Sequence, residues 1–467
     1  MPSPISLITA ITAFLLTWSI AIALGGALAL VRWRGRLRWL GLPMVLFGVG
    51  AAGLQALMNS KYWPVETTRI DANIMQTLAA FIPLSLVIGS AVVGSVFIAR
   101  RLDADRRDQK LVPGLMRASG IALGTITLGL AGMVSLSRAQ DRVVPPADVR
   151  KIEVAPGFTI SLYANDKLRS PTGIAVGPDN RLYVSDLTGK IWAITSDESG
   201  LHAGSIVTYA TGFDWPVGVT WRGNDLYVPS NGKVTIVQDT NGDHVADKMT
   251  DIINDLPTRI HTWHQNNAIT FGPDGRMYFD VGSTSDHDEE KYPLGAAIIS
   301  ANADGSDVRV FARGLRNTFK IAINAAGDMF GGDNGPGGLP VTPNEEVNFL
   351  VKDGDYGFPR EFGIPTVGSK SKSPVVLFPP HTSPDGMTFY NGQQFPTAYR
   401  DNLFVGLWNY GDLYRVELTK DAGEYRSRVT HFASGFVNPL DMTVGPDGAL
   451  YVLDFATNAV YRIAWAG

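Results

Sequence analysis

Hydrophobic and polar residues are distributed differently in the first third of the 467-residue chain and in the remainder. Four long stretches of the first third carry no charged side chain: residues 5–31, 39–58, 72–99 and 118–137. Each is about 20 residues or longer, enough for a helix to cross the hydrocarbon core of a bilayer. Buried helices of a soluble core are the alternative, but they are rarely uncharged over such a length. The pattern therefore predicts an all-α membrane domain of four transmembrane helices over residues 1–137.

The loops between these stretches differ in their basic residues, and the difference indicates an orientation. Two loops are strongly basic, with Arg32, Arg34, Arg36 and Arg38 in one and Arg100, Arg101, Arg106, Arg107 and Lys110 in the other. The loop over residues 59–71 has only Lys61 and Arg69. Because basic loops remain in the cytoplasm, both termini are expected on the periplasmic side of a bacterial inner (cytoplasmic) membrane. Residues 138–155, with Pro145 and Pro146, read as a stiff linker.

From residue 156 onward the pattern changes to short alternating segments separated by Gly, Asp, Asn and Pro. A repeated unit, typified by GPDNRLYVSD and GPDGALYVLD, starts at Gly177, Gly223, Gly272, Ala326, Asp401 and Gly445. Most spacings are about 45–55 residues, the length of one four-stranded propeller blade. The pattern predicts an all-β, six-bladed β-propeller over residues 156–467, with an early strand at residues 158–164 closing the ring. An open sandwich is the alternative that the repeats disfavour.

Composition excludes several classes of function. The chain has no cysteine, so disulfides, thiolate nucleophiles, cysteine-ligated zinc and iron–sulfur clusters are ruled out. The net charge of −4, without a basic stripe in the repeat region, argues against a nucleic-acid partner. Only seven histidines are present, and two of them, His261 and His264, lie together just before a predicted hairpin. The polar run that follows His264 is either a solvated loop or the floor of a site.

Four segments of the repeat region resemble the soluble glucose dehydrogenase and sorbosone dehydrogenase family of quinoproteins. They are LRSPTGIAVGPDNRLYVSDLTGKIWAI from Leu168, HQNNAITFGPDGRMYF from His264, GLRNTFKIAI from Gly314, and DNGPGGLPVTPNEEVNFLVKDGDYGFP from Asp333. The last two lie close together in the chain and are the most specific. The resemblance implies a six-bladed propeller that uses pyrroloquinoline quinone (PQQ) and Ca²⁺.

By this resemblance His264 is the general base. A hydroxyl must lose its proton when hydride leaves the same carbon, and a neutral imidazole, with an ordinary pKa of about 6.5, can accept it. Arg316 and Asn317 match the family's cofactor segment. A guanidinium aimed at a quinone oxygen stabilises the charge that develops there, and Asn317 can donate to cofactor oxygens. An arginine that only fixes one blade to the next is the structural alternative.

The resemblance also implies calcium positions. Gly335 and Pro336 would offer backbone carbonyl oxygens to one ion, and Glu346 with the carbonyl of Tyr356 matches a second, structural position. The basic residues that bind the anionic cofactor in the family are missing: a lysine aligns near Asn409, and two arginines align near Asn438 and Leu440. A family glutamine is also replaced, within FDWPVG. The catalytic end of the site is therefore matched better than the carboxylate-binding end.

Two acidic segments stand outside this comparison. DTNGDHVAD places Asp239, Asn241, Asp243 and Asp247 at the spacing of a calcium loop, although His244 occupies the usual glycine position and the distal glutamate is missing. The alternative is an acidic solvated turn. STSDHDEE, over residues 283–290, reads as a surface loop over the channel in preference to a metal site.

Together these features predict a membrane-anchored, PQQ-dependent oxidoreductase that oxidises a sugar or sugar aldehyde of the aldose or L-sorbosone type. Its partners are the substrate, the lipid bilayer, and ubiquinone or a periplasmic electron acceptor. A non-catalytic binding propeller on a membrane anchor is one alternative. A calcium-dependent, lactonase-like hydrolase is the other, and the missing basic residues favour both.

Overall fold

The computed structural model describes residues 147–258, 264–336 and 343–467. The chain divides into two compact units, Met1–Val143 and Val144–Gly467. The four stretches predicted to cross the membrane, residues 5–31, 39–58, 72–99 and 118–137, lie outside the described residues, and so does His261. Within the described part of the chain, no helix combines the length and apolar character that a membrane span requires.

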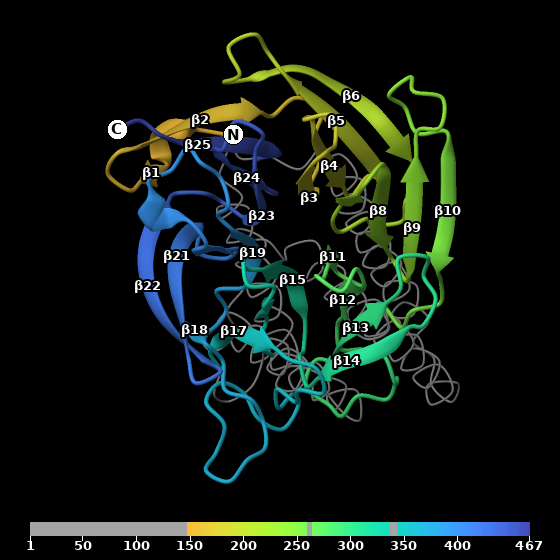
Figure 1. The fold of residues 1–467 in the computed structure, drawn as a ribbon, viewed down its shortest axis with the longest axis vertical. Coiled ribbons are helices and arrows are strands. Elements are labelled where there is room, and N and C mark those ends of the chain that lie inside the picture. Colours follow the sequence, from red (N-terminus) through yellow and green to blue (C-terminus); the bar gives the residue numbers. More distant parts are fainter. Residues whose placement is uncertain (1–146, 259–263, 337–342) are drawn as a thin grey trace, which may run out of the picture. The chain divides into compact units, whose positions relative to one another are not determined.

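The second unit is a six-bladed β-propeller, which confirms the predicted fold (Figure 1). Each blade is an antiparallel sheet whose first strand lies at the central channel and whose last strand lies at the periphery. The first three blades contain β3 (Pro171–Val176), β4 (Leu182–Asp186), β5 (Lys190–Ser196) and β6 (Ala203–Thr211); β7 (Thr220–Arg222), β8 (Asp225–Ser230), β9 (Lys233–Gln238) and β10 (Lys248–Ile253); and β11 (Thr270–Phe271), β12 (Met277–Val281), β13 (Ala297–Ala301) and β14 (Arg309–Arg313).

The last three blades repeat this arrangement with two additions from the start of the unit. They contain β15 (Thr318–Ile323), β16 (Met329–Asp333), β17 (Glu345–Leu350) and β18 (Val376–Phe378); β19 (Pro384–Phe389), β20 (Leu403–Leu407), β21 (Asp412–Asp421), β22 (Glu424–Ser434) and β1 (Glu153–Val154); and β23 (Pro439–Val444), β24 (Leu450–Asp454), β25 (Ala459–Trp465) and β2 (Phe158–Ala164). Two short 3-10 helices are η3 (Val149–Lys151) and η4 (Thr397–Tyr399).

The strand predicted to close the ring does so. β2 forms the outer strand of the sixth blade and pairs antiparallel with β25, so that Phe158 lies opposite Trp465. Phe158 is 7% exposed and makes edge-to-face contacts with Phe395 and Phe432 of the fifth blade, at centroid distances of 4.7 and 4.9 Å. The closing strand therefore joins the last two blades through its side chains as well as through its backbone.

The repeated Gly-Pro-Asp turns have a common physical cause. In the first blade a side-chain carbon at Gly177 would lie 2.4 Å from the ring of Tyr183, so only glycine leaves room for the tyrosine. The Tyr183 hydroxyl donates to Asp179 of the same turn at 2.9 Å. The same pair of contacts recurs at Gly272, Asp274 and Tyr278 and at Gly445, Asp447 and Tyr451. The spacing of glycine, aspartate and tyrosine in the sequence repeat therefore arises from one type of packed turn that recurs in these blades.

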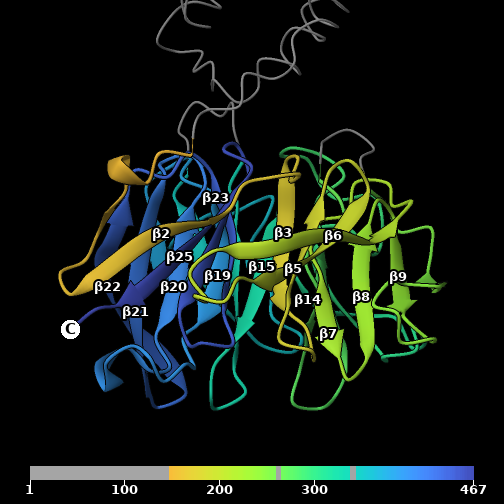
Figure 2. The ribbon, with the colours of Figure 1, turned by 90° about the horizontal axis from the view of Figure 1, so that it is seen from above.

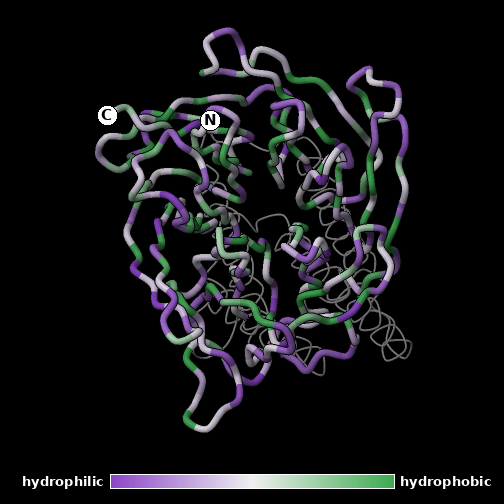
Figure 3. The backbone as a smooth tube through the Cα atoms, viewed as in Figure 1, coloured by the Kyte–Doolittle hydropathy of each residue, from purple (hydrophilic) through white to green (hydrophobic). Residues whose placement is uncertain are grey.

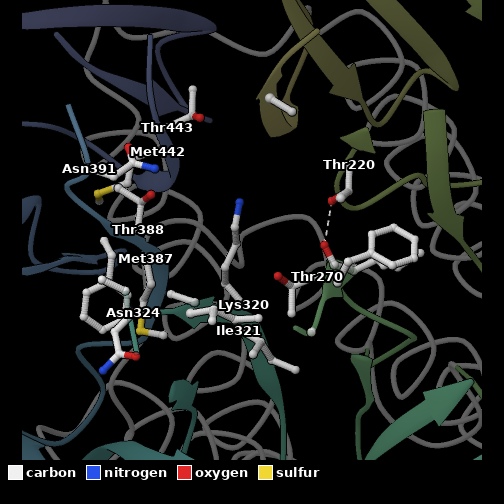
Figure 4. Close-up of a pocket in the computed structure, with 18 of the residues that line it drawn as sticks. Thr220, Thr270, Lys320, Ile321, Asn324, Met387, Thr388, Asn391, Met442 and Thr443 are labelled. Atoms are coloured by element: carbon white, nitrogen blue, oxygen red, sulfur yellow. Dashed lines mark hydrogen bonds between the residues drawn. The ribbon is translucent and has the colours of Figure 1, made fainter. Parts of the chain in front are cut away.

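The inner strands run from one face of the propeller to the other (Figure 2), and these turns mark one of the faces. A hollow of about 960 Å³ opens there, lined by the ends of all six inner strands, including residues 174–176, 269–273 and 320–327 (Figure 4). Its residues do not include the predicted site residues. Lys320 projects into this hollow, and its Nζ lies 2.5 Å from Asp441 of the sixth blade, whose other oxygen accepts from the Ile174 amide.

The burial of the strands is that of sheets packed on both faces. Central strands such as β4, β12 and β24 are buried along their whole length, while β10 and β22 at the periphery are largely exposed. Figure 3 shows the corresponding change from hydrophobic inner segments to hydrophilic peripheral loops. The core is consequently a ring of clusters between neighbouring blades and not one central cluster.

Removal of the phenyl ring of Phe158 on the closing strand β2 is expected to destabilise the whole propeller. Phe158→Ala should lower the free energy of unfolding by about 3–5 kcal/mol, because it leaves a cavity among aromatic side chains of two blades. Thr159→Ala, at the exposed neighbouring position, is the control and should change it by no more than about 0.5 kcal/mol. Thermal and denaturant unfolding measure the change for both variants. Equal changes for Phe158→Ala and Thr159→Ala would show that the buried side chain of the closing strand contributes little to stability.

Candidate functional site

The residues predicted for catalysis and cofactor binding meet at the face opposite the Gly-Pro-Asp turns. His264 precedes β11, and Arg316 and Asn317 precede β15, so both segments enter inner strands from this face. Gly282, at the end of β12, lies between them: a side-chain carbon there would be 2.7 Å from Cβ of His264 and 2.8 Å from Oδ1 of Asn317. The Ser283 amide donates to the Arg316 carbonyl at 2.7 Å. The structure therefore brings His264 and the Arg316–Asn317 pair together.

The hydrogen bond of His264 fixes the chemistry of its ring. Nδ1 lies 2.9 Å from the carbonyl oxygen of Ser283. A carbonyl oxygen can only accept, so Nδ1 carries the proton of the neutral ring. Nε2 is then the nitrogen with a lone pair, which is the form that a general base requires.

The polar run after His264 is the floor of this site and not a solvated loop. Gln265, Asn266 and Asn267 are 4%, 0% and 3% exposed. Gln265 donates to the carbonyl of Trp215 at 3.2 Å, and Asn266 donates to that of Lys233 at 2.7 Å, both in the second blade. These buried amides fasten the segment that carries His264 to the neighbouring blade, although Oε1 of Gln265 is buried without a hydrogen-bond partner among the described residues.

Asn267 also sets the orientation of Asn317. Its Nδ2 group donates to Oδ2 of Asp280 at 2.9 Å and to Oδ1 of Asn317 at 2.9 Å. Because Oδ1 of Asn317 accepts this bond, the NH₂ group of Asn317 is directed away from Asn267. The backbone amides of Arg316 and Asn317 donate to the Asp333 carboxylate at 3.0 and 2.8 Å. Asn267, Asp280 and Asp333 are thus positioning residues that sequence reasoning missed.

A sequence signal for these aspartates was present in the repeat. Asp186, Asp333 and Asp454 each end the second strand of a blade, four residues after the apolar residue that begins it, and Asp280 stands three residues after Met277 in the second strand of the third blade. Asp333 and Asp454 both accept backbone amides from the segment that enters the inner strand of their blade. A repeated aspartate at a strand end therefore marks the residues that hold the channel-entry loops.

The guanidinium of Arg316 is engaged by protein groups on every nitrogen. Nη2 forms an ion pair with Oδ1 of Asp286, Nε donates to the Asp286 carbonyl at 2.9 Å, and Nη1 donates to the Asn334 carbonyl at 3.0 Å. Burial opposes ionisation of Asp286, but the charge and hydrogen bonds of Arg316, helped by His287 and His264, outweigh it and lower the pKa of this carboxyl. The acidic segment 283–290 is a loop, as predicted, yet the sequence did not reveal its contact with Arg316.

The first predicted calcium position lies beside a group of buried carboxylates. The Gly335 amide donates to Glu345 at 2.7 Å, and Glu345 also accepts the His381 amide at 3.0 Å. Asn334 donates to Asp385 at 2.7 Å, while its own Oδ1 is buried without a hydrogen-bond partner within the described part of the chain. Burial raises the pKa of Glu345 to about 8 and that of Asp385 to about 6. Burial therefore favours the neutral, protonated forms of these two carboxyl groups.

The other predicted residues have protein partners. Glu346 is 7% exposed and accepts from the Gly363 amide and from Asn348 at 3.0 Å, and burial followed by the Asp333 charge raises its pKa to about 7. The hydroxyl of the buried Tyr356 donates to the Phe349 carbonyl at 2.5 Å. Asn409 donates to the His381 carbonyl at 2.9 Å, which places it beside the loop that contacts Glu345.

The acidic loop between β9 and β10 adopts the backbone of a compact turn. Asp239 accepts the amides of Gly242 and His244 at 2.7 and 2.8 Å, and His244, at the position where glycine is usual, has a φ of 68°. Asn241 accepts from Asp243, whereas Asp247 accepts from Thr240. Over residues 147–258, 264–336 and 343–467 no three His, Asp or Glu side chains are arranged to hold a metal ion. A calcium ion at this loop stays a prediction.

Residues 145–466 match the family model described as a domain of unknown function, DUF7133, and the chain therefore belongs to that family. An uncharacterized protein of Borreliella burgdorferi is 24% identical over 350 residues, covering 67% of this chain and 90% of that protein. Quinoprotein glucose dehydrogenase B of Acinetobacter calcoaceticus is 20% identical over 292 residues, covering 50% of this chain and 59% of the relative.

Solved structures share the architecture. A putative oxidoreductase (glucose dehydrogenase) of Thermus thermophilus superposes with a TM-score of 0.56 at 24% identity, covering 66% of this chain and 99% of its own. The PQQ-bound aldose sugar dehydrogenase of Streptomyces coelicolor gives a TM-score of 0.54 at 15% identity, covering 67% and 99%. At these identities the likeness establishes a common six-bladed fold, and function must be argued from the site.

Replacement of Asp280 by its neutral isostere is expected to flatten the dependence of stability on pH. Burial, followed by the charge of Asp333, raises the pKa of Asp280 well above its usual range. In the folded protein the Asp280 carboxyl therefore holds a proton that the unfolded chain releases at about pH 4. The free energy of unfolding consequently falls as pH rises above that value. Asp280→Asn keeps the acceptor for Asn267 and removes this loss, so its unfolding temperature should fall less between pH 5 and 8 than that of the wild type.

The measurement is thermal unfolding over this pH range in the presence of a chelator. Asp421→Asn, at a side chain that is 64% exposed, is the matched control and should reproduce the wild-type profile. If Asp280→Asn follows the wild-type curve, the carboxyl is ionised in the folded protein and the argument from burial is wrong.

Proposed function

We propose that the propeller is a quinoprotein oxidoreductase that oxidises a sugar or sugar aldehyde, with His264 as the general base. The observation that carries this proposal is the bond between Nδ1 of His264 and the Ser283 carbonyl, which makes Nε2 the basic nitrogen of a ring whose segment lies next to Asn317 across Gly282. The names of the relatives and structural neighbours, a quinoprotein glucose dehydrogenase and an aldose sugar dehydrogenase, support the same class of reaction.

The residues around Gly335 fit a calcium ion. Calcium prefers hard oxygen ligands, and the segment that carries Gly335 and Pro336 contacts two buried carboxylates, through the Gly335 amide to Glu345 and through Asn334 to Asp385. The buried Oδ1 of Asn334, without a hydrogen-bond partner in the part of the chain that is described, is a further oxygen that a cation would satisfy. A divalent cation at this position would offset the carboxylates whose pKa burial raises.

The same residues fit a quinone at one end only. Arg316 and Asn317 would hold its oxygens, and bound PQQ would supply the two-electron acceptor for the hydride of the substrate. At the other end Asn409, Asn438 and Leu440 stand where the resemblance implies cations. Each charge-assisted contact contributes about 1.5–3 kcal/mol, so an anionic cofactor without these partners depends strongly on calcium.

The protein's part in the reaction is proton transfer and orientation. A substrate hydroxyl next to His264 gives its proton to Nε2, and the ring can turn little because Nδ1 is bound to Ser283. The fixed amide of Asn317 and the guanidinium of Arg316 would orient the oxygen atoms of the quinone. A membrane domain at residues 1–137 would place the propeller on the periplasmic side, where ubiquinone or a periplasmic acceptor removes the electrons.

A second candidate function is a calcium-dependent, lactonase-like hydrolase. The buried carboxylates Glu345 and Asp385, with Asn334 between them and Arg316 already paired with Asp286, favour it. In this alternative a calcium ion would polarise a carbonyl oxygen and His264 would activate water. The two functions differ in whether the protein binds a quinone.

Protein freed of metal is expected to bind PQQ only after calcium is added, because the cation supplies charge that Asn409, Asn438 and Leu440 do not. Titration calorimetry with and without calcium measures this. His264→Ala should retain the affinity but lower the rate of dye reduction by aldoses or aldosones about 10²–10⁴-fold, since it removes only the proton acceptor. Arg316→Ala should reduce both affinity and rate.

His431→Ala is the control for these variants, because this histidine lies on the outer strand β22 and is 49% exposed. It should match the wild type in both assays. Absence of binding at high PQQ concentration with calcium present would contradict the quinoprotein proposal. Hydrolysis of a lactone panel under the same conditions would then identify the second candidate.

The membrane proposal has an independent test in reporter fusions. A reporter that is active only in the cytoplasm should be silent when fused after Gly467 and active when fused within residues 100–110, because the basic loops are expected to remain inside. A reporter active only outside the cytoplasm should give the complementary pattern. The reverse result at both positions would overturn the periplasmic assignment of the propeller.

A further inference from the structure

The loop that follows β12 is built to hold one carboxylate over the site. Glu290 fixes its base by accepting from the amide and hydroxyl of Thr284 at 2.8 and 2.6 Å. Ser283 and Ser285 add bonds within the loop, from the Ser283 hydroxyl to the Ser285 carbonyl at 2.6 Å and from the Ser285 hydroxyl to the Asp288 carbonyl at 2.8 Å. Asp286 lies between the residues that make these hydrogen bonds. The bonds therefore hold the backbone of Asp286 in place.

The contact between Asp286 and Arg316 is asymmetric. The Arg316 side chain is 9% exposed, whereas that of Asp286 is 43% exposed. Arg316 approaches the loop with two of its nitrogens, one to the carboxylate and one to the backbone carbonyl of Asp286. The acid therefore approaches the buried cation from the solvent side, where a ligand entering the mouth of the channel would also approach.

We propose that Asp286 is a specificity-determining residue that occupies Arg316 and excludes anionic ligands until calcium is bound. This inference rests on the proposed function, because it concerns the anionic cofactor of the same site. An arginine remains protonated, so one guanidinium carries one positive charge whether or not a ligand is present. Asp286 already neutralises it, and a ligand oxyanion must either displace this carboxylate or lie beside it against like-charge repulsion.

A calcium ion would relieve this conflict through Asn334, which lies next to the proposed ligands. The Asn334 carbonyl accepts from Nη1 of Arg316, and the neighbouring Gly335 and Pro336 are the proposed calcium ligands. A divalent ion held there would add positive charge near Nη1, whereas Asp286 contacts Nε and Nη2. The Asp286 carboxylate and the calcium ion would thus jointly determine whether an anion can bind at the mouth of the channel.

The test compares Asp286→Asn with Asp288→Asn by titration calorimetry. Asp288→Asn removes the same charge from the same loop, and the bonds of Arg316 described above do not involve its side chain. The probes are PQQ and benzene-1,3,5-tricarboxylate, an aromatic trianion that cannot act as a quinone. Without calcium, Asp286→Asn should bind both probes at least about tenfold more tightly than the wild type, a difference of about 1.4 kcal/mol. Asp288→Asn should behave as the wild type.

The outcomes separate this proposal from the proposed function. Tighter binding of the tricarboxylate by Asp286→Asn, with no PQQ binding by any form, supports the role of Asp286 and contradicts the quinoprotein. PQQ binding that is equal in the wild type and in Asp286→Asn keeps the quinoprotein and overturns the role of Asp286. Failure of Asp286→Asn to bind either probe also overturns it.

A second variant covers the case in which loss of the ion pair disturbs the loop. Asp286→Glu retains the negative charge and should keep the weak, calcium-dependent binding of the wild type. If Asp286→Glu binds anions as tightly as Asp286→Asn, the gain comes from loop rearrangement and the charge-based proposal is wrong. Thermal unfolding of each variant establishes that the proteins compared are folded.

Discussion

The pairing of β2 with β25 is the constraint on which the remaining structure depends. It joins residues 158–164 to the last strand of the chain and converts six sheets into a closed ring. Closure directs the inner strand of every blade toward one channel and leaves the propeller without a free edge between its first and last blades. His264 precedes the inner strand of the third blade, and Arg316 and Asn334 belong to the fourth, so their common location follows from the arrangement of neighbouring blades around this channel.

The fold was predictable because its signals are local and repeated. The Gly-Pro-Asp turns record contacts between residues only six apart, such as Gly177 and Tyr183, and therefore recur in the sequence at the period of a blade. His264, Arg316 and Asn317 were also predictable as neighbours, since each precedes an inner strand on the same face. The four stretches predicted to cross a membrane rest on a different local signal, the absence of charge, and lie outside the residues that the structure describes.

The partners of the site residues were less predictable, because they depend on how blades pack. Asn267 and Asn317 are 50 residues apart, and Asp286 and Arg316 are 30 apart, with no periodic pattern linking them. The acidic loop at residues 283–290 is hydrophilic along its whole length, so composition indicates only exposure. Which of its carboxylates turns toward an arginine is decided by the bonds of Glu290 and the two serines. Such contacts are visible only in three dimensions.

The charged groups around Arg316 determine which ligands these contacts would admit. Asp286 forms an ion pair with Arg316 and its pKa is lowered, so it is ionised at neutral pH. Burial raises the pKa of Glu345 to about 8 and so favours its neutral form. An anionic ligand that approaches Arg316 would therefore meet the ionised carboxylate of Asp286, whereas a neutral sugar would meet no charge repulsion there.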